Sequence, residues 1–305
     1  MLFIKKQKIL FLLLLLATVF LFLVNISLGS VSIPLKEVVK GLFGQEMQKE
    51  SWEIILWNFR FPKAITAILV GIGLSISGLM MQTLFRNPLA GPYVLGLSSG
   101  ASLGVAFVIL GSRLLPTFIA SFFLSSYGLV MASSLGAFLV LLAVLLVSQK
   151  LKDTMAILIV GLMFGSFTSA IVSVLSYFST AEKLQKFTFW SMGSISNLTW
   201  QEISILSLLT LIGIVLSFTV IKPLNALLLG EKYAQSIGVN YKKTRFLIIV
   251  ATSILAGSIT AFAGPIAFIG LAVPHIAKLL FQTSNHKILF FNTLLIGGIL
   301  MLICD

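Results

Sequence analysis

Long apolar runs separated by short polar segments are the feature that most restricts how this chain can fold. Apolar residues make up 58% of its 305 residues, charged residues make up only 10%, and the mean hydropathy is +1.09. A soluble domain carries nearer ~25% charged residues. In a bilayer every backbone polar group needs a partner within the protein, so these runs are expected to be helices. We therefore predict an all-α, polytopic transmembrane bundle that forms a single domain over residues 1–305.

The lengths of the runs predict nine membrane spans, since each run reaches or approaches the ~20 residues that a crossing helix needs. The predicted spans are residues 9–24, 64–84, 93–111, 117–147, 155–178, 203–221, 246–263, 266–281 and 288–304. A cleaved signal peptide is the alternative for the first run. No clear A-x-A cleavage site follows that run, which favours a retained span.

Three shorter segments have patterns of their own. Residues 34–43 repeat apolar side chains at helical spacing and predict an external helix at the membrane interface. Residues 187–200 are too short and polar to cross, and their tryptophans predict a short outer or re-entrant helix. Residues 263–278 hold two glycines and two prolines in an apolar background, which predicts a broken or shortened helix at membrane depth. Small residues four apart in the second span, such as Gly71 and Ser75, favour close helix packing.

The basic residues set the orientation of the chain. If the N-terminus is cytosolic, the inner loops hold thirteen basic residues against two acidic ones, Asp153 and Glu231. The positive-inside rule supports this direction and places the polar segment 222–245 in the cytosol. The net charge of +12 follows from this topology. No nucleic-acid-reading motif accompanies it, so no nucleic-acid partner is expected.

The polar segment 222–245 lies between two apolar runs and is itself partly apolar. Pro223 can begin a helix, and Gly230 and Gly238 offer two places where the backbone can turn. This pattern predicts an ordered cytosolic helical hairpin that a partner could grip. A basic anchoring loop is the alternative.

Several functions lack the residues that they need. The single cysteine, Cys304, excludes an internal disulfide and a cysteine zinc cluster, and we expect neither a metal site nor a cofactor. No Gly-Lys pair occurs, so the chain has no Walker A loop, and any ATP must be hydrolysed by another chain. No acidic residue lies clearly inside a span, which disfavours an ion-coupled carrier without excluding it.

Residues 96–100, Gly-Leu-Ser-Ser-Gly, match the G-x-S-x-G pattern of a serine nucleophile, with His275 as a conceivable base. An intramembrane protease therefore stays an alternative, although small residues at the start of a packed span explain the match more simply. The other histidine, His286, lies in a polar loop, where we expect it to be solvated.

Five segments carry a resemblance to a known family. They are FRFPKAI from residue 59, RNPLAGPYVLG at 86–96, FWSMGSISNLTW at 189–200, LLGEKYAQSIGV at 228–239 and GPIAFIGLAVPHIAK at 264–278. In this order they resemble the FecCD-type permeases of ABC importers, which carry iron-siderophore complexes, haem and cobalamin and include the cobalamin importer permease. The resemblance implies two permease copies around a central pathway, cytosolic ATP-binding cassette ATPase subunits, an extracytoplasmic substrate-binding protein and a metal-chelate substrate.

The resemblance also implies roles for particular residues. Arg60 and Lys63 match outward-facing bases that meet carboxylates of the binding protein, with interfacial anchoring as the alternative. The expected cytosolic gate comprises Asn87, Pro88, Leu89, Thr154 and Met155, although Thr154 or Asp153 could simply cap a helix. The expected ATPase-coupling residues are Leu229, Gly230, Glu231, Ala234, Ile237 and Gly238.

The family's pattern continues beyond a residue like Asp305 with a basic residue and a tenth span. We therefore expect nine of ten spans here, with the C-terminal span missing. The expected function is permease subunit of an importer for iron(III)-siderophore complexes in the cytoplasmic membrane. The subunit would work as a homodimer or with a paralogue, and it is not itself an enzyme. Haem or cobalamin is the alternative cargo.

Overall fold

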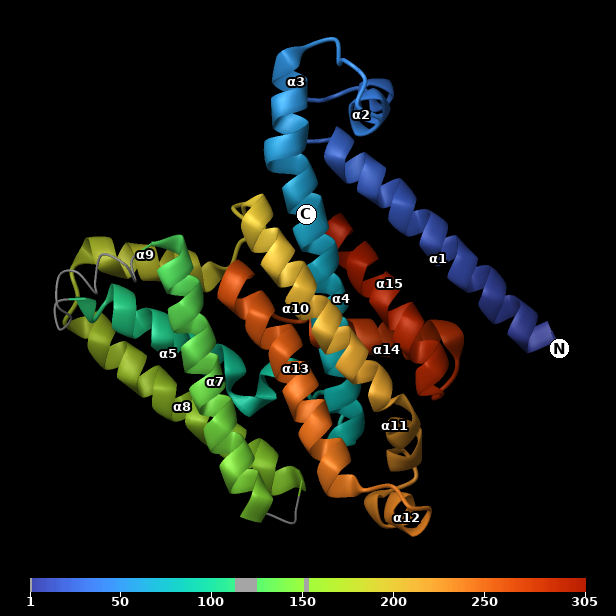
Figure 1. Cartoon of the computed structure of the whole chain (residues 1–305). Coiled ribbons are helices and arrows are strands. Elements are labelled where there is room, and N and C mark those ends of the chain that lie inside the picture. The colour runs from blue at the N-terminus through green and yellow to red at the C-terminus, as the bar shows by residue number, and fades with distance from the viewer. Residues whose placement is uncertain (1, 113–124, 151–153) are drawn as a thin grey trace.

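The computed structural model describes residues 2–112, 125–150 and 154–305 (Figure 1). Within these ranges every regular element is helical, which confirms the predicted fold class. The elements are α1 (Leu2–Ser27), α2 (Leu35–Leu42), α3 (Glu50–Ile55), the π-helical turn η1 (Leu56–Arg60), α4 (Phe61–Leu84), the 3₁₀ turn η2 (Pro92–Leu95), α5 (Leu97–Ile109), α7 (Ser126–Lys150), α8 (Thr154–Tyr177), α9 (Ala181–Met192), α10 (Trp200–Thr219), α11 (Ile221–Leu227), α12 (Glu231–Ser236), α13 (Tyr241–Ala263), α14 (Ile269–Phe281) and α15 (His286–Cys304).

Seven helical segments of the described chain are long and apolar enough to cross a membrane: α1, the α3–η1–α4 run, α7, α8, α10, α13 and α15. Two further apolar helices, α5 and α14, have 13 residues each. At 1.5 Å per residue each is ~20 Å long, which is less than the hydrocarbon thickness of ~30 Å. These nine helices lie where the nine spans are predicted. The start of the predicted span 117–147 lies outside the described residues.

Helix α4 lies at the centre of the bundle and contacts α10, α13, α14 and α15. Its small residues allow the backbones to touch, as their spacing predicts. A Cβ atom added to Gly71 would lie 2.5 Å from the carbonyl carbon of Gly297 in α15. A Cβ atom added to Gly78 would lie 2.5 Å from that of Gly270 in α14. The three helices α4, α14 and α15 are therefore packed backbone to backbone.

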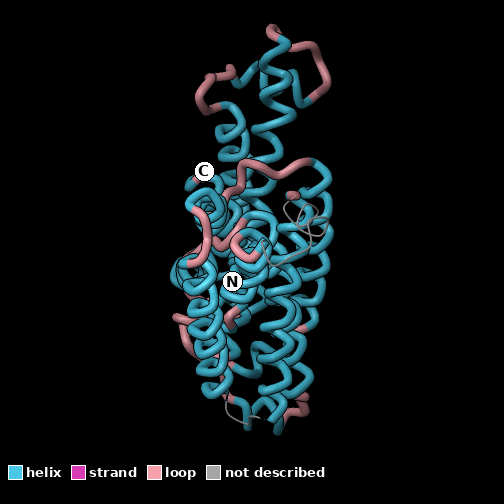
Figure 2. Tube along the Cα trace, turned by 90° about the vertical axis from the view of Figure 1, so that its left-hand side faces the viewer, coloured by secondary structure: helices cyan, strands magenta, loops and turns pink. Residues whose placement is uncertain are grey.

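The run α3–η1–α4 is one continuous helix of 35 residues, from Glu50 to Leu84. Its length of ~52 Å exceeds the hydrocarbon thickness. Its outer end projects beyond the other spans and carries α2 beside it (Figures 1 and 2). The predicted helix at 34–43 is confirmed as α2, with Val38 buried and Leu35 half exposed.

One predicted helix is misplaced and one predicted break is confirmed. The segment 187–200 is not one helix, because α9 ends at Met192 and Gly193 turns the chain with φ +74°. The next helix starts at Trp200, where Thr199 and Glu202 form a capping box. Residues 264–268 interrupt the apolar stretch between α13 and α14, which confirms the predicted break.

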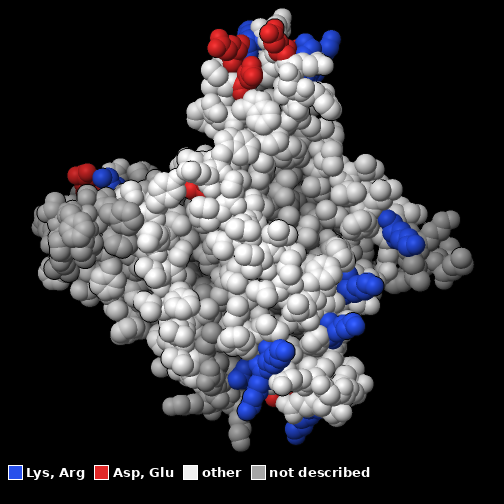
Figure 3. Space-filling model, in the orientation of Figure 1, with Lys and Arg blue, Asp and Glu red and all other residues white. Residues whose placement is uncertain are grey.

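Charges are distributed unequally over the face shown in Figure 3. Basic side chains lie around the end that holds α11, α12 and the start of α13 and along the right-hand side of this view, whereas most of the acidic side chains gather at the projecting tip of α3, where basic side chains lie beside them. This arrangement agrees with the orientation predicted from the sequence, with the α11–α12 end in the cytosol.

Candidate functional site

The polar segment after α10 folds into a helical hairpin, as predicted. Helices α11 and α12, together with the turns at Gly230 and Gly238, form this hairpin, which spans residues 221–238 and is called the cytosolic hairpin here after its predicted location. Gly230 has φ +122° and Gly238 has φ +90°, values that side chains disfavour. A Cβ atom on Gly230 would also lie 2.8 Å from the guanidinium of Arg86. The positive φ therefore requires glycine at Gly230, whereas the contact with Arg86 involves only the end of a flexible side chain.

The six predicted coupling residues divide between the inside and the outside of the cytosolic hairpin. Ala234 is buried, and Glu231 begins α12, where its carboxylate accepts a hydrogen bond of 3.1 Å from the Gln235 side chain. Leu229 and Ile237 point outward and are 67% and 56% exposed. The cytosolic hairpin thus presents an apolar surface on an ordered backbone.

The second predicted site is the turn that follows α4, called the gate turn here (residues 86–89). Arg86 has φ +48°, and the Asn87 side-chain oxygen accepts a hydrogen bond of 2.9 Å from the Leu89 backbone N–H. Leu89 is 75% exposed, so its side chain is free to contact a neighbouring chain. Thr154 and Met155, the other predicted gate residues, begin α8, and Asp153 lies outside the described residues.

Side chains at the inner end of α4 contact the cytosolic hairpin. Arg86 Nη2 donates a hydrogen bond of 3.2 Å to the Leu227 carbonyl at the end of α11. The ring of His286 lies between α4 and α11, with Nε2 2.8 Å from Thr83 Oγ1 and Nδ1 2.9 Å from Asn225 Oδ1. Two of the predicted sites, the gate turn and the cytosolic hairpin, are therefore joined.

The expectation that His286 is solvated is wrong. Its side chain is only 1% exposed, because Asn285 caps α15 and the helix begins directly at His286. The first turn of α15 then points the ring into the contact between α4 and α11. The sequence gives no signal for this burial, since the same residues would also fit an open polar loop.

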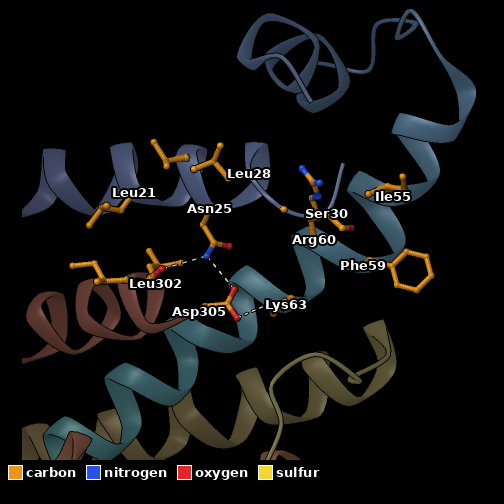
Figure 4. Close-up of a pocket in the computed structure, with 13 residues that line it drawn as sticks. Leu21, Asn25, Leu28, Ser30, Ile55, Phe59, Arg60, Lys63, Leu302 and Asp305 are labelled. Atoms are coloured by element: carbon orange, nitrogen blue, oxygen red, sulfur yellow. Dashed lines mark hydrogen bonds and ion pairs between the residues drawn. The ribbon is translucent and has the colours of Figure 1, made fainter. Parts of the chain in front are cut away.

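The outer bases lie on one wall of a cavity of about 720 Å³ between α1, the α3–η1–α4 run and α15 (Figure 4). Arg60 Nη1 donates hydrogen bonds of 3.0 and 2.7 Å to the carbonyls of Ile26 and Ser27, at the end of α1. Its other terminal nitrogen contacts the Val31 carbonyl. Lysine and arginine stabilise helix C-termini in this way.

Lys63 points toward the end of α15. Its Nζ lies 2.8 Å from an Asp305 carboxylate oxygen, and Asn25 donates a hydrogen bond of 3.0 Å to the other oxygen. Arg60 differs, because no carboxylate of the described residues lies within ion-pair distance of it. The structure thus brings Arg60 and Lys63 to the same cavity, each partly exposed and in contact with the chain's own groups.

The protease alternative lacks its local geometry. Ser98 lies in the first turn of α5, after the 3₁₀ turn η2, so the strand that a nucleophile elbow needs is not present at this place. His275 is exposed on α14. Packing explains the small residues better, since a Cβ atom on Gly100 would lie 2.6 Å from the Gly136 carbonyl oxygen of α7.

Comparisons with known proteins agree with this architecture. The model of the FecCD transport family matches residues 15–305. The chain belongs to the FecCD transport family. The vitamin B12 import system permease BtuC of Salmonella typhimurium is 35% identical over 83% of this chain and 74% of its own length. The hemin transport system permease HmuU of Yersinia pestis is 33% identical over 96% of this chain and 86% of its own.

A solved structure supports the same conclusion. It is described as an inward-facing conformation of a metal-chelate type ABC transporter and matches with a TM-score of 0.85 and 29% identity, over 98% of this chain and 89% of that one. The FecCD family member described here is thus an ABC importer permease, a multi-pass membrane protein. Permeases of this class work with ATPase subunits and binding proteins and often dimerise.

Proposed function

We propose that this FecCD permease carries iron(III)-siderophore complexes inward across the cytoplasmic membrane, with ATP hydrolysed by a separate ATP-binding cassette subunit. The observation that carries the ATP-driven mechanism in this proposal is the exposed apolar surface of the cytosolic hairpin. Leu229 and Ile237 would lie against water in an isolated chain, although the backbone around them is ordered. Exposed apolar surface with a polar rim is typical of a protein docking site.

In this proposal the cytosolic hairpin is the part that the ATPase grips. Leu229 and Ile237 supply contact area, Glu231 marks the first turn of α12, and Ala234 packs the hairpin against the bundle. The glycines Gly230 and Gly238 fix the two turns. Closure of the ATPase pair would tilt the attached spans and change which side of the pathway is open.

The pathway would form between two permease copies, either identical or paralogous. Asn87, Pro88 and Leu89, with Thr154 and Met155, would close its inner end. The exposed Leu89 side chain fits this role, since a gate needs an apolar group that can meet its counterpart.

Arg60 and Lys63 would receive carboxylates of the extracytoplasmic binding protein. The guanidinium of Arg60 is bonded to neutral carbonyls, so its charge can attract an approaching carboxylate. Each exposed ion pair contributes only ~0 to 1 kcal/mol. The two bases would therefore set orientation and association rate more than affinity.

Haem and cobalamin are the alternative cargoes, and the names of the BtuC and HmuU relatives favour them. The three cargoes are large metal chelates that an external binding protein can select. Selectivity would then reside mainly in that binding protein.

Uptake into vesicles tests the proposal. The tagged permease is first extracted from its native membrane together with its partners. Mass spectrometry then shows whether an ATPase with a Walker A motif is present in the purified complex. The complex is then reconstituted, and ATP-dependent uptake of a labelled ferric siderophore, haem and cobalamin is measured. Faster uptake of the siderophore than of haem and cobalamin supports the proposal. Faster uptake of haem or cobalamin would instead identify that compound as the cargo. Uptake that needs an ion gradient and no ATPase refutes the importer mechanism.

A further inference from the structure

Two side-chain links join the cytosolic hairpin to the last turn of α4 and to the gate turn that follows it. One is the hydrogen bond from Arg86 to the Leu227 carbonyl. The other runs from Asn225 in α11 through the His286 ring to Thr83 in α4. Thr83 lies three residues before Arg86, where the gate turn begins. Both links thus end at the segment that leads into the gate turn.

The hydrogen-bond pattern orients the Asn225 amide beside the His286 ring. Asn225 Oδ1 accepts the His286 backbone N–H at 2.8 Å, so this atom is the amide oxygen. The same oxygen lies 2.9 Å from Nδ1, which must therefore donate. Nε2 lies 2.8 Å from Thr83 Oγ1, whose single hydroxyl proton also has the Leu79 carbonyl within 2.9 Å. The ring therefore bridges α11 and α4 through one contact at each of its nitrogens.

Burial makes this bridge hard to replace. His286 and Thr83 are 1% and 4% exposed, so bulk water cannot substitute for a lost partner. A buried polar group left without its hydrogen bond is costly. A displacement of α11 therefore carries the end of α4 with it. Gln82, the residue before Thr83, donates a hydrogen bond of 3.0 Å to the Leu271 carbonyl, which extends the connection to α14.

We propose that His286 is a positioning residue for transport: it transmits movement of the cytosolic hairpin to the gate turn through Asn225 and Thr83. This inference rests on the proposed function, because it assumes that an ATPase moves the cytosolic hairpin. The residue contacts no cargo and acts only through the helices that it joins.

The test changes one atom of the bridge. Thr83→Val removes the hydroxyl and keeps the volume, whereas Thr83→Ser keeps the hydroxyl. Thr66→Val is a matched control, since Thr66 lies in the same helix, is buried, and bonds the carbonyl four residues earlier, as Thr83 does. Only Thr83 of this pair contacts His286. Each variant is reconstituted with the ATPase, the binding protein and the transported chelate, and ATP hydrolysed per chelate imported is measured.

Thr83→Val should raise that ratio roughly fivefold, at the low end of typical coupling between two sites. Thr83→Ser and Thr66→Val should keep the wild-type ratio. Asn225→Ala breaks the same bridge from the other side and should raise the ratio too. The double variant Thr83→Val/Asn225→Ala should not exceed the larger single effect, because the two bonds act in series.

Three results would overturn the inference: an unchanged ratio in Thr83→Val, an equal rise in Thr66→Val, or additive effects in the double variant. The first would show that the bridge transmits nothing, and the second that any lost hydroxyl in α4 uncouples. A wild-type complex without ATP-dependent uptake of any chelate is a different failure, because it refutes the proposed function itself.

Discussion

Replacing Gly78 by alanine should destabilise the bundle, because α4 and α14 touch through their backbones there. The new Cβ atom would lie 2.5 Å from the Gly270 carbonyl carbon and closer still to its oxygen. Ordinary contact needs at least 3.4 Å, so the two helices must separate by about 1 Å or more. Overpacking of this kind costs about 1–3 kcal/mol, or more where backbone meets backbone.

A second glycine provides the control. Gly257 lies inside α13, and a Cβ atom there would meet no atom within 4 Å. Gly257→Ala should therefore gain the ~0.5–1 kcal/mol by which alanine exceeds glycine in a helix. Gly78→Ala should lose about 1–2 kcal/mol after the same gain is subtracted. The two variants differ only in what the added methyl group meets.

The assay is unfolding of the purified protein in detergent, followed by tryptophan fluorescence against denaturant concentration. The expected order of midpoints is Gly257→Ala at or above wild type, and Gly78→Ala clearly below it. Equal midpoints for Gly78→Ala and wild type would refute the close approach of α4 and α14. An equal loss in both variants would show that any methyl group in this bundle is harmful, whatever it contacts.

Three other changes have defined outcomes. Gly230→Pro should uncouple ATP hydrolysis from uptake while the protein remains in the membrane, because proline cannot adopt φ +122°; normal uptake would remove the coupling role of the hairpin. The pKa of Glu37 is lowered from its ordinary value of 4.5, because its carboxylate accepts hydrogen bonds from Lys40 and from the Gln48 backbone. The ionised carboxylate therefore stabilises the outer α2 segment above pH 4.5, and this stabilisation is lost as the pH falls through the lowered pKa. Hydrogen-exchange protection factors in residues 35–48, which correct for the intrinsic pH dependence of exchange, should therefore fall on acidification in wild type but not in Glu37→Gln, and equal pH dependence in both would contradict this. Lys63→Met should slow association of the binding protein at low salt, because it removes a positive charge from the wall of the outer cavity. An unchanged, salt-independent association rate would argue against docking there, and Lys186→Met on α9 is the control.

The sequence predicts those parts of the fold that local chemistry determines. Glycine and proline mark the break at Gly264, and positive φ values occur at Gly230 and Gly238, where turns are predicted. Charge asymmetry predicts the orientation because it is a property of whole loops. Helix 187–200 is misplaced because the tryptophans indicate depth in the membrane and carry no information on where a helix ends.

The sequence cannot predict contacts that depend on how distant helices meet. The burial of His286 arises from α4 and α11, which lie far away in the chain. The carbonyl groups that bind Arg60 likewise lie at the end of α1, and the residues next to Arg60 in the sequence give no sign of this contact. The roles proposed for Arg60, the gate turn and the cytosolic hairpin stay predictions until the assays above are made.

The continuous helix from Glu50 to Leu84 acts geometrically as a lever. Its inner end leads directly into the gate turn, and Arg60 and Lys63 lie in its outer half. For a rigid rod of ~52 Å, a tilt of only about 5° at the inner end displaces the outer tip by roughly 4–5 Å. In the proposed mechanism, a small tilt of this helix beside the ATPase would therefore produce a much larger displacement at its outer tip, near the side where the binding protein is proposed to dock.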